Sequence, residues 1–381
     1  MQSLYRLFQQ ISLTFKGAII LMKKILTVTN PTITLFPGYA ATGAILENYE
    51  ETYDWFYSQY IQLLLYNETH RSPDDRPTRG AFFFDFDSRY RARLWHAHAF
   101  IEYNWCPFLK IFNCDTKMLM REHEEFISLI KRCINQDYYL FMRLVNEPIT
   151  AFSDMRQAFP HETFIFGYDD TNREVYFGDY FFKGKRRYSF GTCSYHDVES
   201  AAKQTWNTYA GKKHEIALVH YEDKVSYHMN YRYVVDQIYD YLYPSIRISE
   251  ELKSYIKDNI KINEPKVYLG INVYNYLVDF INEELGLGKT QIDYRMFHGL
   301  LDHKRMMKNR LDYLLHKNHL SYNKYELCKE YDCVVKTACI IRNEIIKYEY
   351  THNRDLLNVA QERLLELKQI EFQILHHIFM E

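Results

Sequence analysis

The sequence predicts an α+β protein, because a stretch with strand periodicity and strong turns is followed by long stretches with helix periodicity. Residues 138–191 contain runs of aromatic and β-branched residues separated by short turns, which is typical of a small antiparallel sheet. No Pro follows Pro265, and four of the 13 Gly fall between Gly167 and Gly191. Since Gly and Pro interrupt regular structure, the C-terminal part is expected to be almost unbroken helix.

The residues before the sheet are predicted to alternate between helix and strand. Apolar and aromatic residues recur at spacings of three and four over residues 44–66, which predicts an amphipathic helix. The polar residues 67–79 predict a loop, and residues 80–90 predict a strand. Residues 108–120 and 124–134 are predicted to be helices.

The sheet itself is predicted to consist of four strands. They cover residues 138–146, 163–168, 174–180 and 186–191. Between the second and the third stands Asp169-Asp170-Thr171-Asn172, whose side chains favour a tight turn. These two strands are therefore expected to form a hairpin.

Long helices are predicted from residue 248 onward. Ser249 is expected to cap the first, and a second covers residues 267–284 before Gly286 and Gly288 end it. Two longer segments, 322–349 and 354–380, carry apolar residues at near-heptad spacing, which predicts an antiparallel helical hairpin. These apolar residues are Val334, Ala338, Ile341, Ile345, Leu357, Leu364, Leu367 and Ile374.

The composition excludes several classes of protein. There are 35 Tyr and 25 Phe but only 13 Gly and 9 Pro, which excludes disordered and collagen-like chains. The formal net charge of -2 gives no field that would attract a nucleic acid, so no such partner is expected. A length of 381 residues allows two domains. We expect an N-terminal extension over residues 1–22, an α+β domain over 23–245 and a helical region over 246–381.

The cysteines and the N-terminus indicate a cytoplasmic protein. Seven Cys without a CxxC pair suit a reducing compartment. The apolar stretch 13–21 is too short to span a bilayer, and no small-residue cleavage site follows it, so neither a membrane span nor a signal peptide is expected.

Two motifs partly resemble a phosphate-binding loop and a metal site, but neither matches its consensus pattern. The segment Gly286-Leu-Gly288-Lys289-Thr290 has Glu283 where a phosphate-binding loop has its first Gly, and it follows a helix instead of a strand. His96 and His98 have no carboxylate or thiol nearby in the sequence to complete a metal site. No cofactor and no metal are therefore expected.

The predicted hairpin holds the residues with the most distinctive chemistry. With the turn centred near Asp170, His161 lies directly opposite Asp179, and a carboxylate in that position can orient an imidazole that acts as a base. A turn centred one residue later leaves the two only diagonally related. The pattern alone fits a structural hydrogen bond as well as a catalytic pair.

The stretch around this hairpin resembles a known family. It runs through FISLIKRCINQDYYLFMRLVNEPITAF, FPHETFIFGYDDTNREVYFGDYFF and SYHDVESAA. It is similar to the papain-like family of the butirosin-biosynthesis acyltransferase and, more distantly, to peptidases that process bacteriocin leaders. The resemblance implies a papain-like (cysteine-peptidase-like) N-terminal domain in which His161 is the general base and Asp179 orients it.

The same resemblance implies a Cys nucleophile at the start of an early helix. Residues 31–48 contain no Cys, and Tyr39 and Thr42 are the hydroxyls at the expected helix start. Cys106, which precedes a Pro, is the remaining candidate, because a thiol at a helix N-terminus has a lowered pKa. The alternative is a pseudoenzyme that has lost its nucleophile.

Two functions follow from the resemblance. In the first, the protein transfers acyl or peptidyl groups in natural-product (nonribosomal peptide or aminoglycoside-like) biosynthesis, with Cys106, His161 and Asp179 as the triad. In the second, it is an accessory protein that binds an acyl or peptidyl carrier protein, or a peptide, without catalysis. The basic residues Lys304, Arg305, Lys308 and Arg310 either dock an acidic carrier protein or form a solvated helix face.

Overall fold

The protein is α+β and divides into two compact units. The computed structural model describes residues 22–67, 80–84, 106–121, 124–152, 160–185, 187–208, 215–246, 253–254, 267–286 and 292–381. We call Met1–Thr52 with His96–Ser226 the sheet unit, and Tyr53–Trp95 with Tyr227–Glu381 the helical unit. The expected boundary near residue 245 differs from this division, because residues 53–95 and 227–245 cluster with the C-terminal helices.

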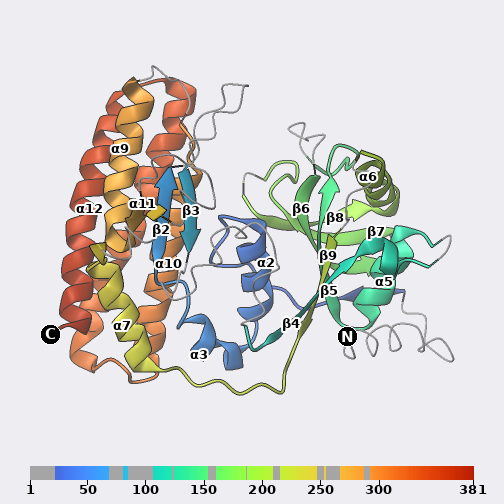
Figure 1. Ribbon diagram of the computed structural model, residues 1–381, viewed down its shortest axis with the longest axis horizontal. Coiled ribbons are helices and arrows are strands. Elements are labelled where there is room, and N and C mark those ends of the chain that lie inside the picture. The colour runs from blue at the N-terminus through green and yellow to red at the C-terminus, as the bar shows by residue number, and fades with distance from the viewer. Residues whose placement is uncertain are drawn as a thin grey trace. The chain divides into compact units, whose positions relative to one another are not determined.

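The sheet unit is built on a seven-stranded antiparallel sheet. Its strands follow the order β4-β9-β5-β6-β7-β8 (Figure 1), and β1 pairs with β6 beyond the beginning of β5. The predicted strands of residues 138–191 are thus confirmed as its centre, although the last begins at Ser189. The strands are β1 (Lys23–Ile25), β4 (Leu109–Asp115), β5 (Tyr138–Val145), β6 (Pro160–Asp169), β7 (Glu174–Asp179), β8 (Ser189–Ser194) and β9 (Glu215–Tyr221).

Helices cover both faces of this sheet. Figure 1 shows α2 (Pro37–Leu46) on one side of the sheet and α5 (Phe126–Asn135) with α6 (Tyr195–Thr208) on the other. Every residue of α2 is buried, so this helix lies inside the unit's core. Two short helices, Glu50–Thr52 and α4 (Thr116–Leu119), complete the unit.

Two predicted helices are wrong. Residues 109–115 form the edge strand β4, because their backbone pairs with all of β9, and only 116–119 are helical. The predicted helix over 44–66 is instead the end of α2, two short helical turns and the strand β2 (Leu63–Asn67). Apolar residues at spacings of three and four cannot separate a helix from a fully buried strand, which has no polar face.

Within its described residues, the helical unit combines six α-helices, one of them the four-residue α3, with a three-stranded sheet of order β10-β2-β3. The predicted hairpin is confirmed as α11 and α12, and all eight of its near-heptad residues are buried. The elements are α3 (Tyr53–Phe56), β2, β3 (Gly80–Phe84), α7 (Tyr231–Leu242), β10 (Val267–Leu269), the turn Gly270–Asn272, α9 (Val273–Gly286), α10 (Arg295–His316), the turn Tyr322–Lys324, α11 (Tyr325–Thr351) and α12 (Asp355–Phe379).

Several sequence predictions fall outside the described residues. These are the N-terminal stretch 1–21, the loop 68–79, the pair His96 and His98, and the cap Ser249. The helix predicted over 267–284 is shorter than expected, because Val267–Leu269 pairs with β2, but it does end at Gly286.

Candidate functional site

The structure brings His161 and Asp179 together as diagonal neighbours. Phe164 pairs with Gly178, so Asp179 comes opposite Thr163, two residues from His161. The direct pairing that the sequence favoured is therefore wrong, and the register with the later turn is the one formed. The side chains still meet, with 3.5 Å between His161 Nδ1 and Asp179 Oδ2, because residues two apart on a strand share a face.

The Asp179 carboxylate is fully buried and partly held by the backbone. Its Oδ1 accepts hydrogen bonds from the amides of Tyr180 at 2.6 Å and Phe181 at 3.3 Å. Its Oδ2 is left facing His161, and 3.5 Å is too long for a strong hydrogen bond, so we treat the contact as an ion pair. Burial lowers the pKa of His161, but the Asp179 carboxylate outweighs it and leaves that pKa above its ordinary value.

Aromatic rings surround the imidazole. The ring of Phe181 lies 4.7 Å from that of His161 and nearly perpendicular to it, and Tyr180 lies 6.1 Å away. The side chain of His161 keeps 19% of its surface exposed, whereas that of Asp179 keeps none. A ligand can therefore approach the imidazole but not the carboxylate behind it.

Cys106 is not brought to this pair. It precedes β4, whose beginning aligns through β9 with the beginning of β5, whereas His161 pairs with Leu144 near the end of β5. Strands lie about 4.8 Å apart and rise about 3.4 Å per residue, so Cys106 and His161 are more than about 20 Å apart. Burial also raises the pKa of the Cys106 thiol to about 12. The expected triad of Cys106, His161 and Asp179 is not assembled.

The hydroxyls near the start of α2 do not replace the missing thiol. Tyr139 points away from His161, because it is five residues along β5 from Leu144, the direct partner of His161. Its hydroxyl donates to the carbonyl of Thr27 at 2.7 Å, and the amide of Thr29 in turn donates to the carbonyl of Ala44 in α2. Tyr39 and Thr42 therefore belong to a helix, α2, that lies on the face of the sheet opposite to the His161 side chain.

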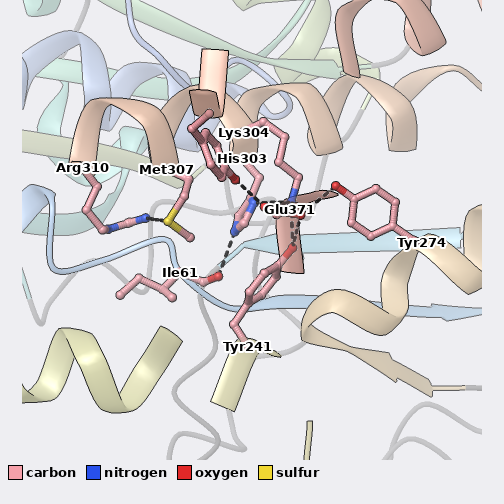
Figure 2. A network of polar contacts seen from close by, with 9 residues as sticks. Ile61, Tyr241, Tyr274, His303, Lys304, Met307, Arg310 and Glu371 are labelled. Atoms are coloured by element: carbon pink, nitrogen blue, oxygen red, sulfur yellow. Dashed lines mark hydrogen bonds and ion pairs between the residues drawn. The ribbon is translucent and has the colours of Figure 1, made fainter. Parts of the chain in front are cut away.

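A second polar cluster, in the helical unit, was not expected from the sequence. Lys304 and Glu371 form an ion pair at 2.8 Å whose side chains are both completely buried. The hydroxyls of Tyr241, Tyr274 and Tyr331 all donate to the Glu371 carboxylate (Figure 2). The cluster therefore joins α7, α9, α10, α11 and α12 through one carboxylate.

Burial removes two of the four basic residues on α10 from both interpretations. Lys304 and Arg310 are each 0% exposed, so they neither dock a partner nor form a solvated face, whereas the side chain of Arg305 is 41% exposed. The ammonium of Lys304 also donates to the Tyr241 hydroxyl at 2.8 Å and to His303 Nδ1 at 3.0 Å. Burial lowers the pKa of Lys304, and the Glu371 carboxylate opposes this shift. On the other four helices, the spacing of the aromatic residues indicates which face is buried. It does not indicate which polar groups these side chains meet.

No protein-family model matches this sequence, and no curated protein matches it either. Within the described residues there is no group of three His, Cys, Asp or Glu side chains that could hold a metal ion. Among the helices of the described residues, none has the length and apolar character needed to cross a membrane.

Proposed function

We propose that this chain is a noncatalytic protein of natural-product biosynthesis that binds an acyl or peptidyl chain borne by a carrier protein. We also propose that its sheet unit descends from the papain-like fold of the butirosin-biosynthesis acyltransferase. The observation that supports both is a buried His161-Asp179 pair without a thiol. Such a pair can hold a ligand but has no nucleophile to transfer it.

The chemistry of thioester transfer favours binding over catalysis. Transfer needs a thiolate within hydrogen-bonding reach of its base, about 3 to 4 Å. Cys106 lies at the other end of the sheet, and with a pKa of about 12 its thiol stays protonated at neutral pH. Cys193 lies on the neighbouring strand β8 but is buried and pairs with Val175, four residues or about 13 Å along β7 from Asp179.

His161 offers the group that would hold the ligand. Its Nδ1 faces the carboxylate, and 19% of its side chain is exposed. The protonated ring can donate from Nε2 to the carbonyl oxygen of an acyl or peptidyl chain, while the Phe181 ring provides an apolar contact.

The test combines a binding and a turnover measurement on one probe, an acyl-N-acetylcysteamine thioester. Saturation-transfer NMR should show binding to the wild type and to Cys106→Ser, and strongly reduced binding to His161→Ala. Mass spectrometry should show no loss of thioester above the rate without protein, with or without an amine acceptor.

Arg143→Gln is the matched control, because Arg143 adjoins the site on β5 but is exposed and pairs with Glu162. It should bind the probe as the wild type does. If the wild type consumes the thioester and His161→Ala does not, the protein is an enzyme and the proposal is wrong. Equal binding by the wild type and by His161→Ala would also contradict the proposal.

A further inference from the structure

His303 in the helical unit is held in one protonation state by its two partners. It is fully buried on α10, and its Nε2 lies 2.8 Å from the carbonyl oxygen of Ile61. Its Nδ1 lies 3.0 Å from the ammonium of Lys304 (Figure 2). A carbonyl only accepts and an ammonium only donates, so the ring carries its single proton on Nε2 and accepts at Nδ1.

A second proton has no room at Nδ1. It would point at the Lys304 ammonium, which is already held by Glu371 on α12 and by Tyr241 on α7. The ring of Tyr241 packs 5.2 Å from that of His303. The hydroxyls from α9 and α11 point at Glu371, so they do not compensate a charge on His303. Burial first, and then Lys304 and Arg310, lower the pKa of His303 well below its ordinary value.

The carbonyl that His303 holds belongs to a short segment, residues 57–61, which we call the strap. Arg310 donates to the carbonyls of Tyr57 and Gln59, and His303 donates to that of Ile61. Residues 57–60 form turns and bends, and Tyr60 has a φ of 60°, so two side chains seven residues apart on α10 hold three carbonyls of an irregular segment. The strap leads directly into β2.

We propose that His303 is a pH-sensitive latch: protonation of its ring breaks the contact with Lys304 and releases the strap from α10. This device is independent of the proposed function. In the released state the ring is solvated and has its ordinary pKa near 6.5. In the held state it takes up no second proton, so each pH unit below 6.5 favours release by up to about tenfold.

The test is hydrogen exchange of the full chain at pH 7.5 and pH 5.0, with rates corrected for intrinsic exchange. Between pH 7.5 and 5.0 the protection of residues 57–65 should fall by up to about thirtyfold, as expected for the uptake of one proton with a pKa near 6.5. Protection of α12 should not change. His303→Gln should abolish the pH dependence, because a glutamine amide can donate to Ile61 and accept from Lys304 but does not titrate.

His298→Gln is the matched control, since His298 lies on the same helix and pairs with Asp302. It should keep the wild-type response. Three results would contradict the latch. They are unchanged protection of the strap in the wild type, an equal loss of protection in His303→Gln, and a loss of protection that includes α12. If His303→Gln does not fold, the latch is tested by the protection of the strap and of α12 at the two pH values, measured in the wild type and in His298→Gln. Protection that falls at low pH in the strap but not in α12 supports the latch, and any other result contradicts it.

Discussion

Two histidines, the partly buried His161 and the fully buried His303, show how neighbours set the charge of a side chain. His161 faces the Asp179 carboxylate, which raises its pKa against the effect of burial. His303 faces the Lys304 ammonium, which adds to burial and lowers its pKa. The interaction of His161 with Asp179 therefore stabilises the fold at low pH and is lost as pH rises through the folded-state pKa. Burial of His303 has the opposite effect on stability, because it destabilises the fold as pH falls below the unfolded-state pKa of this histidine.

At the residue scale, the thiols should differ sharply in reactivity. Cys333 is exposed and lines a groove of about 450 Å³ between α11 and α12, whereas Cys106 is 2% exposed and its burial raises its pKa. We expect iodoacetamide to label Cys333 in the native protein within the time in which Cys106 stays unmodified, because alkylation needs an accessible thiolate. Peptide mass spectrometry measures both.

The comparison with His161→Ala makes this labelling informative. If the His161 imidazole activated Cys106, its removal in His161→Ala would slow the labelling of that thiol. Identical labelling in the two proteins is expected, and rapid labelling of Cys106 that depends on His161 would contradict the binding function.

At the element scale, the cluster around Glu371 fixes how the helices pack. One carboxylate accepts from three tyrosines and from Lys304, so four helices must each present one side chain to α12 at the same level. A buried ion pair is weak evidence of net stabilisation, because desolvation of the two charges offsets their attraction. Its effect is to penalise every arrangement that leaves one of these groups unpaired.

Removal of one partner should therefore destabilise the protein strongly. We expect Glu371→Gln to lower the free energy of unfolding by about 3 to 5 kcal/mol, because the Lys304 ammonium stays buried without its counter-charge. The double variant Lys304→Met/Glu371→Leu should also be less stable than the wild type. It leaves three tyrosine hydroxyls unpaired, at about 1 to 3 kcal/mol each.

Chemical denaturation measures both values, and Asp312→Asn supplies the control. Asp312 is exposed and pairs with Lys308 on the same helix, and such surface pairs contribute less than about 1 kcal/mol. A double variant as stable as the wild type would mean that the tyrosines find other partners, and that the cluster does not fix the packing.

At the scale of the whole molecule, the chain enters the helical unit twice. Residues 53–67 are held there by His303, by Arg310 and by the hydroxyl of Tyr313, which donates to Asp54 at 2.7 Å. All three side chains come from α10, more than 200 residues later in the sequence. The first part of the helical unit thus depends on helices that come much later in the sequence.

A fragment of residues 23–245, the α+β domain predicted from the sequence, should consequently not fold like the full chain. It lacks α9 to α12, so Ile61 and Leu63 to Leu65, all 0% exposed in the whole protein, lose their cover. Each such side chain contributes about 1.5 to 3 kcal/mol when buried. Gel filtration and ANS binding should show aggregation or exposed apolar surface.

The full chain under the same conditions is the reference for this fragment. A monomeric fragment with a cooperative unfolding transition and no ANS binding would show that residues 53–67 do not need the C-terminal helices.

Sequence patterns by themselves determined the elements whose chemistry is local. The turn Asp169 to Asn172 defined the hairpin and placed His161 and Asp179 on facing strands, and the near-heptad pattern defined α11 and α12. Only the tertiary structure decided what depends on distant partners. Pairing with β9 made residues 109–115 a strand, the register placed Cys106 far from His161, and three other helices enclosed Lys304 and Glu371. The physical reason is that periodicity reports which side of an element is buried, whereas register and charge pairing arise from groups that meet only when the chain is folded.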